Sequence, residues 1–271
     1  MIRIIIGTLI LGSISCDRIE YYPDRPLTNL ETYVLGHAGS GLVGRGNTME
    51  SCINGLTLSD GIEIDLQMSS DGTLWLSHSE NTIACGTFGE ECFHVISDKR
   101  IEEINTCLGP ANSYPKLGAI FDYINKNHPE SFVSLDVKVW TPCGIGDINV
   151  TRKMNIIGQK IIDLVRLYHL ENQIMVESEV GDFLYYIRTN SDFIETYLTT
   201  LGDYELGVSR ALASKFSGIS FKYKFTESIT KDQIDLLHRK GLKIHLWPVN
   251  GTEDILDAKA LGADFIQTDT F

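Results

Sequence analysis

Short apolar runs alternate with longer segments of helical periodicity along most of the chain. The short runs are typical of β-strands, and the segments between them repeat apolar residues with the period of an amphipathic helix. This alternation is characteristic of βα units that build a parallel sheet. We predict eight strands, at Tyr33–Gly36, Ile62–Leu66, Phe132–Val137, Gln173–Glu177, Phe193–Leu198, Gly218–Phe221, Leu242–Trp247 and Asp264–Gln267.

Helices are predicted between these strands. They fall at Met49–Ser59, Leu117–Asn127, Arg152–Leu170, Val180–Thr189, Tyr204–Lys215, Lys231–Lys240 and Glu253–Leu261. Eight strands with intervening helices indicate the α/β class and a single (β/α)8 barrel, or TIM barrel, over residues 33–271. Two long connections, Ser79–Lys116 and Val139–Thr151, interrupt the pattern, and long loops on a compact scaffold are usually functional. Asn47 and Glu50 are spaced to form a capping box at the start of the first helix.

Residues 1–15 differ in composition from the rest of the chain. Arg3 precedes an almost wholly apolar run from Ile4 to Leu11, which is too short for a finished membrane span and is typical of an export signal. Cys16 follows small residues and resembles the acylation site of bacterial lipoproteins. We therefore expect an exported protein, anchored through a lipid on Cys16 at the periplasmic or cell-surface side of a membrane, with residues 16–32 as a tether. Plain cleavage and secretion, or a buried first strand, are the alternatives.

Five further cysteines follow Cys16, and none has zinc-site spacing. In an oxidising compartment Cys85 and Cys92 could close a short loop. The sequence leaves the pairing open, and five cysteines leave at least one unpaired in a monomer.

The net charge of the chain limits the classes of partner that it can bind. Its 36 acidic and 23 basic residues give a formal net charge of −13, so the surface lacks the basic excess that binding to nucleic acid requires. A phosphate-bearing substrate remains compatible if a cation reverses the charge locally.

Polar residues cluster where the predicted strands end, which is where barrel enzymes carry their active sites. Glu63 and Asp65 lie two positions apart on one strand and share a side, as do Asp136 and Lys138 on another. His37, His78 and Trp247 complete the candidate set.

Three carboxylates that converge without a cation would repel one another, and a hard divalent cation removes this repulsion. Oxygen-only ligands favour Mg²⁺ or Ca²⁺, so Glu63, Asp65 and Asp136 form a candidate site for one such ion. The two histidines suit general acid and base chemistry, and Lys138 could offset charge in a transition state. Such a set could cleave a phosphodiester. The alternative without chemistry is a salt-bridged layer in which Glu63 and Asp65 pair with Lys138 and no metal binds.

The order of these residues resembles the signature of glycerophosphodiester phosphodiesterases, in the phospholipase-C-like phosphodiesterase superfamily. The resemblance rests on Gly36-His37-Ala38-Gly39, Asn47-Thr48, Gly61-Ile-Glu63-Ile-Asp65, Ser70-Asp71-Gly72 through His78, Leu135-Asp136-Val137-Lys138, Leu246-Trp247 and Gly262 to Asp269. It implies a barrel with Glu63, Asp65 and Asp136 on the metal and His37 and His78 as the acid/base pair. The reaction it implies is hydrolysis of a small glycerophosphodiester to sn-glycerol 3-phosphate and an alcohol. Lys138 and Trp247 would contact the substrate.

Two positions depart from the family pattern. Ala38 replaces an arginine and Gly46 replaces a glutamate. We expect Arg45 to bring a guanidinium to the phosphate in place of the missing one. Asp136 and the cysteines after His78 also resemble sphingomyelinase D-like phospholipases, so a phospholipase D-like, cyclising reaction on lysophospholipids is an alternative. A catalytically inert barrel that binds a phosphate-bearing ligand is another.

Overall fold

The computed structural model describes residues 31–40, 44–138, 143, 150–201, 204–224 and 229–271. The expected export signal at 1–15, Cys16 and nearly all of the tether lie outside these residues. Among the described residues, no helix combines the length and apolar character needed to cross a bilayer.

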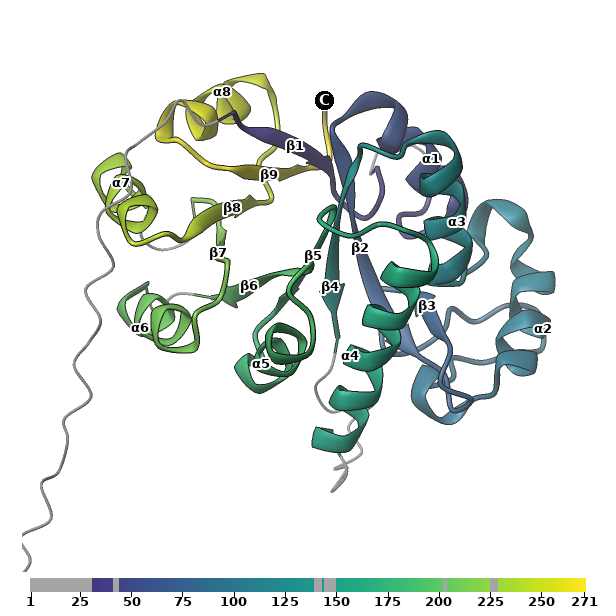
Figure 1. Ribbon diagram of the computed structural model, residues 1–271. Coiled ribbons are helices and arrows are strands. Elements are labelled where there is room, and N and C mark those ends of the chain that lie inside the picture. The colour runs from purple at the N-terminus through teal and green to yellow at the C-terminus, as the bar shows by residue number, and fades with distance from the viewer. Residues whose placement is uncertain (1–30, 41–43, 139–142, 144–149, 202–203, 225–228) are drawn as a thin grey trace, which may run out of the picture.

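The eight predicted strands form a closed parallel barrel (Figure 1). Strand β1 pairs with β2 on one side and with β9 on the other, which closes the sheet. An extra antiparallel strand, β3 (Leu74–Leu76), pairs with β2 outside the ring. The barrel strands are β1 (Tyr33–Gly36), β2 (Gly61–Met68), β4 (Phe132–Val137), β5 (Ile174–Ser178), β6 (Glu195–Thr200), β7 (Gly218–Lys222), β8 (Lys243–Trp247) and β9 (Phe265–Thr268).

The seven predicted helices lie around the outside of the ring of strands (Figure 1). Their ends differ from the predicted ones by a few residues at most. They are α1 (Met49–Leu58), α3 (Leu117–Asn127), α4 (Val150–Leu167), α5 (Gly181–Asn190), α6 (Tyr204–Ser214), α7 (Lys231–Arg239) and α8 (Thr252–Leu261). The single-barrel prediction is confirmed.

The long connection after β3 contains a helix that the sequence pattern did not indicate, α2 (Asp98–Leu108), between short 3-10 turns at Phe93–Val95 and Pro110–Asn112. Only Ile101 and Ile104 of α2 are buried, so its apolar face is too narrow to give a clear period. These residues join a small separate core with Trp75, Phe93, Ile96 and Tyr114. The connection is therefore a folded insertion with its own core.

The possible Cys85–Cys92 bridge is not formed. Cys85 pairs with Cys107 in α2, and Cys92 pairs with Cys143 in the connection after β4. Helix α2 returns the chain to Cys85, and sequence spacing alone could not reveal this return. Cys52 is buried and unpaired, in keeping with the expected odd cysteine.

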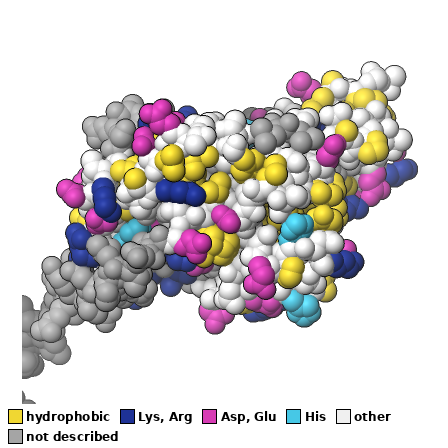
Figure 2. Space-filling view, turned by 90° about the horizontal axis from the view of Figure 1, so that it is seen from above, with side chains coloured by type: hydrophobic (Ala, Val, Ile, Leu, Met, Phe, Trp, Pro, Cys, Tyr) yellow, Lys and Arg dark blue, Asp and Glu magenta, His cyan; other side chains and the backbone are white. Residues whose placement is uncertain are grey.

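The two ends of the barrel differ in polarity. Aromatic rings from the first residues of three strands, Tyr33, Phe132 and Phe265, stack and pack edge-on at the amino end, with ring centroids 4.5 to 5.6 Å apart. Tyr197 joins them in a buried cluster. This end of the barrel is thus packed mainly by aromatic rings, beside one ion pair between Lys243 and Glu195. On the outer face in Figure 2, acidic side chains lie at several separate places among hydrophobic and basic ones.

Asp98 attaches the insertion to the barrel. Its carboxylate accepts hydrogen bonds from Ser69 Oγ at 2.6 Å, from Trp75 Nε1 at 3.0 Å and from Thr73 Oγ1. Desolvation tends to raise the pKa of Asp98, but these donors outweigh it and lower the pKa below its ordinary value. The ionised form is therefore the one that stabilises this junction.

We expect Asp98→Asn to lower the free energy of unfolding by about 1 kcal/mol at neutral pH, because one oxygen and the charge are lost. Because the pKa of Asp98 is lowered in the folded state, its carboxylate stabilises the fold at pH values above the ordinary pKa of 3.8. The difference in stability between the wild type and Asp98→Asn should therefore shrink as the pH falls below 3.8. Chemical denaturation from pH 7 to pH 3 measures it. Asp122→Asn, which affects only an exposed pair with Lys126, is the control. Equal stability of the two variants would contradict this assignment.

Candidate active site

Three carboxylates converge at the carboxyl end of the barrel. Glu63 and Asp65 project from β2, and Asp136 projects from β4, where it is the register partner of Asp65. One ligand oxygen from each lies within 4.8 Å of the others. Glu63 and Asp65 are buried, and 28% of the Asp136 side chain is exposed. The structure therefore brings together the three residues that the sequence assigned to a cation.

Burial and mutual repulsion act on this carboxylate cluster. Desolvation raises the pKa of Glu63 well above its ordinary value, and the charge of Asp65 raises it further. The pKa of Asp136 is also raised, chiefly by burial, against the opposing charge of Lys138. The cluster thus holds more negative charge than its protein partners compensate.

Lys138, which follows β4, is the basic partner of the cluster. Its Nζ lies 2.9 Å from Asp65 Oδ1 and also contacts Asp136 Oδ2. Desolvation would lower the pKa of Lys138, but the charges of Asp136 and Asp65 outweigh it and raise the pKa. One ammonium against three carboxylates leaves a formal charge of −2, and hard oxygen ligands match Mg²⁺ or Ca²⁺. The residues present therefore fit one divalent cation.

His37 lies beside this cluster at the end of β1. Its Nδ1–H donates to Asp269 Oδ1 at 2.7 Å, and its Nε2 lies 3.8 Å from Glu63 Oε2. Burial tends to lower the pKa of His37, but the bond to Asp269 and the charge of Glu63 raise it to about 9. Asp269 therefore orients the ring, and without a cation in the site the protonated form is favoured at neutral pH.

The turn after His37 is shaped by small residues. Ala38 and Gly39 both have positive φ, at 51° and 85°. This turn directs the Ala38 N–H to Glu63 Oε2 at 2.8 Å and the Gly39 N–H to the Glu63 carbonyl at 2.7 Å. A Cβ on Gly46 would lie 2.7 Å from Ala38 Cβ. The two departures from the family pattern are therefore in direct contact, and a side chain at position 46 would collide with Ala38.

His78 lies at the same end of the barrel, next to a cavity that Lys138 also lines. It follows β3, where the Ser77 N–H donates to the Asp65 carbonyl at 3.0 Å and so ties this segment to the end of β2. The His78 side chain is exposed and lines a cavity together with Lys138. The hairpin β2–β3 thus returns the second histidine to the barrel mouth.

Asn47 has a different role from the expected one. Thr48 caps α1 and forms the capping box with Ser51. Asn47 instead donates from Nδ2 to Asp65 Oδ2 at 2.7 Å, and its Oδ1 accepts from the Asp65 N–H at 2.9 Å. These two bonds fix the orientation of Asp65. The capping-box prediction was one residue out of register.

Arg45 points away from the cluster. Its guanidinium stacks on the Tyr114 ring, 4.0 Å from the centroid, and donates to the Asn112 carbonyl.

Trp247 ends β8 at the barrel mouth and is half-buried. Its Nε1 is buried without a hydrogen-bond partner in the part of the chain that the structure describes. Lys222 Nζ lies 5.9 Å from the centroid of the Trp247 ring.

Sequence reasoning missed two acids near the site. Asp269 bonds His37, and Glu177 at the end of β5 is buried beside Asp136 in register. Glu177 accepts from Ser134 Oγ, Ser220 Oγ and Gln267 Nε2. Both acids stand at or just after the carboxyl end of a predicted strand, which is the same signal that revealed Asp136.

The buried His245 is a packed histidine, as expected. Its Nδ1 lies 3.7 Å from Glu177 Oε2, and burial lowers its pKa to about 3.

Comparisons with known proteins agree with this geometry. The Glycerophosphoryl diester phosphodiesterase family profile matches residues 36–271. A glycerophosphodiester phosphodiesterase of Caldanaerobacter subterraneus subsp. tengcongensis is 26% identical over 250 residues, which cover 89% of this chain and 95% of the relative.

Solved structures share the fold. A candidate glycerophosphoryl diester phosphodiesterase from Silicibacter pomeroyi has a TM-score of 0.74 at 19% identity, with 93% of each chain covered. A phosphodiesterase from Oleispira antarctica, solved with sn-glycerol-3-phosphate, has a TM-score of 0.69 at 16% identity, covering 89% of this chain and 93% of that one. The family match over most of the chain shows that the protein belongs to the glycerophosphoryl diester phosphodiesterase family and is a phosphoric diester hydrolase.

Proposed function

We propose that the protein hydrolyses small glycerophosphodiesters to sn-glycerol 3-phosphate and an alcohol with the help of one divalent cation. The observation that carries this proposal is the convergence of Glu63, Asp65 and Asp136 within 4.8 Å at the barrel mouth, beside His37. The product bound to the Oleispira antarctica phosphodiesterase supports the choice of the glycerol 3-phosphate half.

The three carboxylates would hold Mg²⁺ or Ca²⁺, which when bound supplies positive charge to a phosphate oxygen. His37 and His78 act as the acid/base pair. One accepts the proton of the glycerol hydroxyl next to the phosphoester as that oxygen attacks phosphorus, and the other protonates the departing alcohol oxygen. Water then opens the resulting cyclic phosphate with the two roles exchanged, which gives sn-glycerol 3-phosphate. Asp269 holds the His37 ring in place for this transfer.

Lys138 and Trp247 complete the substrate site in this proposal. Lys138 Nζ is held at Asp65 and Asp136, so it places a positive charge next to the cluster. Trp247 ends β8 at the barrel mouth and is half-buried, so the exposed part of its ring can pack against the substrate. The guanidinium of Arg45 contacts Tyr114 and the Asn112 carbonyl, so phosphate binding by Arg45 would require it to leave these partners.

We also propose that the protein is exported and anchored through Cys16. The apolar run before Cys16 motivates this, and the bridges Cys85–Cys107 and Cys92–Cys143 support it, since disulfides persist in oxidising compartments. Cell fractionation of the full chain beside Cys16→Ser tests the anchor. Release of that variant from membranes supports acylation, and unchanged membrane association contradicts it.

Removal of the cation or of either histidine should abolish turnover. With glycerophosphocholine as substrate, we expect EDTA, His37→Ala and His78→Ala each to lower kcat by about 10²–10⁴-fold. Added Mg²⁺ or Ca²⁺ should restore the EDTA-treated enzyme but neither variant. His128→Ala, at the end of α3, is the control.

Phosphorus NMR of the same reactions identifies the product. Hydrolysis gives sn-glycerol 3-phosphate, whereas the phospholipase D-like alternative gives a cyclic or lipid-linked phosphate. Turnover that survives EDTA or both histidine changes would contradict the mechanism.

Cation binding can also be measured without substrate. A ligand that binds only the folded state raises stability, by about 2.7 kcal/mol at 100 times its Kd. We expect Mg²⁺ or Ca²⁺ to raise the Tm of the protein, and Asp65→Asn to reduce that increase strongly. Asp122→Asn is the control. An identical Tm increase in the Asp65 variant would exclude the carboxylate cluster as the cation site.

Asp269→Asn should loosen His37 without removing a reacting group. We expect kcat to fall by roughly 10–100-fold, part of the usual contribution of acid/base catalysis, with KM little changed. In protein freed of cations, the His37 pKa should fall from about 9, because the bond and charge of Asp269 raise it. NMR titration of the imidazole protons measures this. A variant with full kcat and an unchanged His37 titration would refute the positioning role.

A further inference from the structure

A cavity of about 470 Å³ opens directly beside the proposed reaction centre. Its lining includes His78 and Lys138 and also Glu80, Asn81, Thr82 and Glu90 from the folded insertion. The cavity therefore joins one of the two proposed acid/base residues to a segment that no part of the proposed reaction uses.

The wall of this cavity is held in place by the backbone. The Thr82 N–H donates to the Glu91 carbonyl at 2.8 Å, and the Phe93 N–H donates to the Glu80 carbonyl at 3.0 Å. The Ile83 N–H donates to Tyr114 Oη at 2.8 Å. Residues 80–83 are thus held against residues 91–93 and Tyr114, which fixes the course of their backbone along the cavity.

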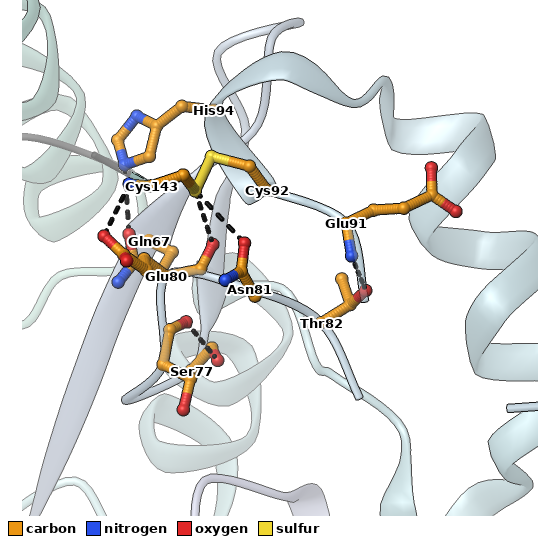
Figure 3. Close-up of a disulfide and its surroundings, with 10 residues drawn as sticks. Gln67, Ser77, Glu80, Asn81, Thr82, Glu91, Cys92, His94 and Cys143 are labelled. Atoms are coloured by element: carbon orange, nitrogen blue, oxygen red, sulfur yellow. Dashed lines mark hydrogen bonds between the residues drawn. A yellow bond between two sulfur atoms is a disulfide. The ribbon is translucent and has the colours of Figure 1, made fainter. Parts of the chain in front are cut away.

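The Cys92–Cys143 bridge adds a covalent link across the same wall. Figure 3 shows Gln67, Glu80 and Asn81 gathered around it. The Cys143 N–H donates to Glu80 Oε2, and Cys143 Sγ lies 3.2 Å from Asn81 Oδ1. Glu80 is therefore fixed at the cavity by a backbone donor from another part of the chain.

The chemistry of the wall is acidic and rich in hydrogen-bond acceptors. Glu80 and Glu90 supply two carboxylates, and Asn81 and Thr82 supply an amide and a hydroxyl. Among the described residues, the cavity lining includes no Phe, Tyr or Trp. Quaternary ammonium groups are typically recognised by aromatic cages, whereas a primary ammonium donates N–H bonds to carboxylates and amides.

We propose that this cavity binds the alcohol half of the substrate and favours a primary ammonium alcohol of the 2-aminoethanol type. This inference rests on the proposed function, since phosphate placement at His78 and Lys138 directs the alcohol into the cavity. Glu90 and Glu80 attract the ammonium, and Asn81 and Thr82 offer further acceptors. A quaternary ammonium has the charge but no N–H donor, and a neutral polyol has donors but no charge.

The test compares three diesters that share the glycerophosphate half and differ in the alcohol: 2-aminoethanol, choline and glycerol. We expect the wild-type chain to have the highest kcat/KM for the aminoethanol diester. Glu90→Gln should lower the ratio of kcat/KM for the aminoethanol diester to that for the glycerol diester by roughly fivefold. Glu90 is exposed, so this change is compatible with folding.

Glu80→Gln, which keeps an acceptor for the Cys143 N–H, should lower the same ratio. Glu130→Gln removes an equal charge at an exposed position just before β4, at the opposite end of that strand from Lys138, and should leave the ratio unchanged.

The outcomes separate the two claims. If none of the three diesters is hydrolysed, the proposed function is wrong and this inference fails with it. If all three are hydrolysed with similar kcat/KM and Glu90→Gln leaves their ratios unchanged, only the inference is overturned. If Glu90→Gln lowers kcat/KM for the choline and aminoethanol diesters by the same factor, the cavity senses charge alone, and recognition through N–H donors is wrong.

Discussion

The carboxyl end of the barrel holds three carboxylates close together, those of Glu63, Asp65 and Asp136. Their mutual repulsion would destabilise the fold without positive charge nearby, and Lys138 supplies part of that charge. Buried charges need partners, and the protein supplies only one ammonium for three carboxylates. The strands impose this crowding, since Asp65 and Asp136 are neighbours in register and Glu63 is on the same side as Asp65. Raised pKa values for Glu63 and Asp136 are the direct electrostatic consequence.

The rest of the site can be understood as support for that arrangement. Asn47 orients Asp65 through two hydrogen bonds, and the Ala38 N–H satisfies Glu63. The aromatic rings at the amino end close the barrel with apolar packing. The carboxylate cluster is consequently built at the end where a substrate can enter.

The barrel and the three acids at its mouth were predictable, because each follows from a pattern within a short stretch of sequence. The barrel follows from alternating periods, and Glu63, Asp65 and Asp136 follow from their places at strand ends. The disulfides were not predictable, because Cys107 reaches Cys85 only after α2 folds on a narrow apolar face. The partnership of Asp269 with His37 was also hidden, since it joins the two ends of the barrel sequence through closure of β1 on β9.

Local charge also accounts for how an acidic protein can accept a phosphodiester. The whole chain carries a formal −13, which disfavours extended polyanions. At the mouth, three carboxylates and Lys138 sum to a formal −2, and the divalent cation of the proposed function would bring that sum to about zero. Repulsion of a singly charged diester would thereby be removed. A more positive site would hold a phosphomonoester product more firmly, because the product carries close to two negative charges. The crowded carboxylates thus suit both cation binding and release of the product.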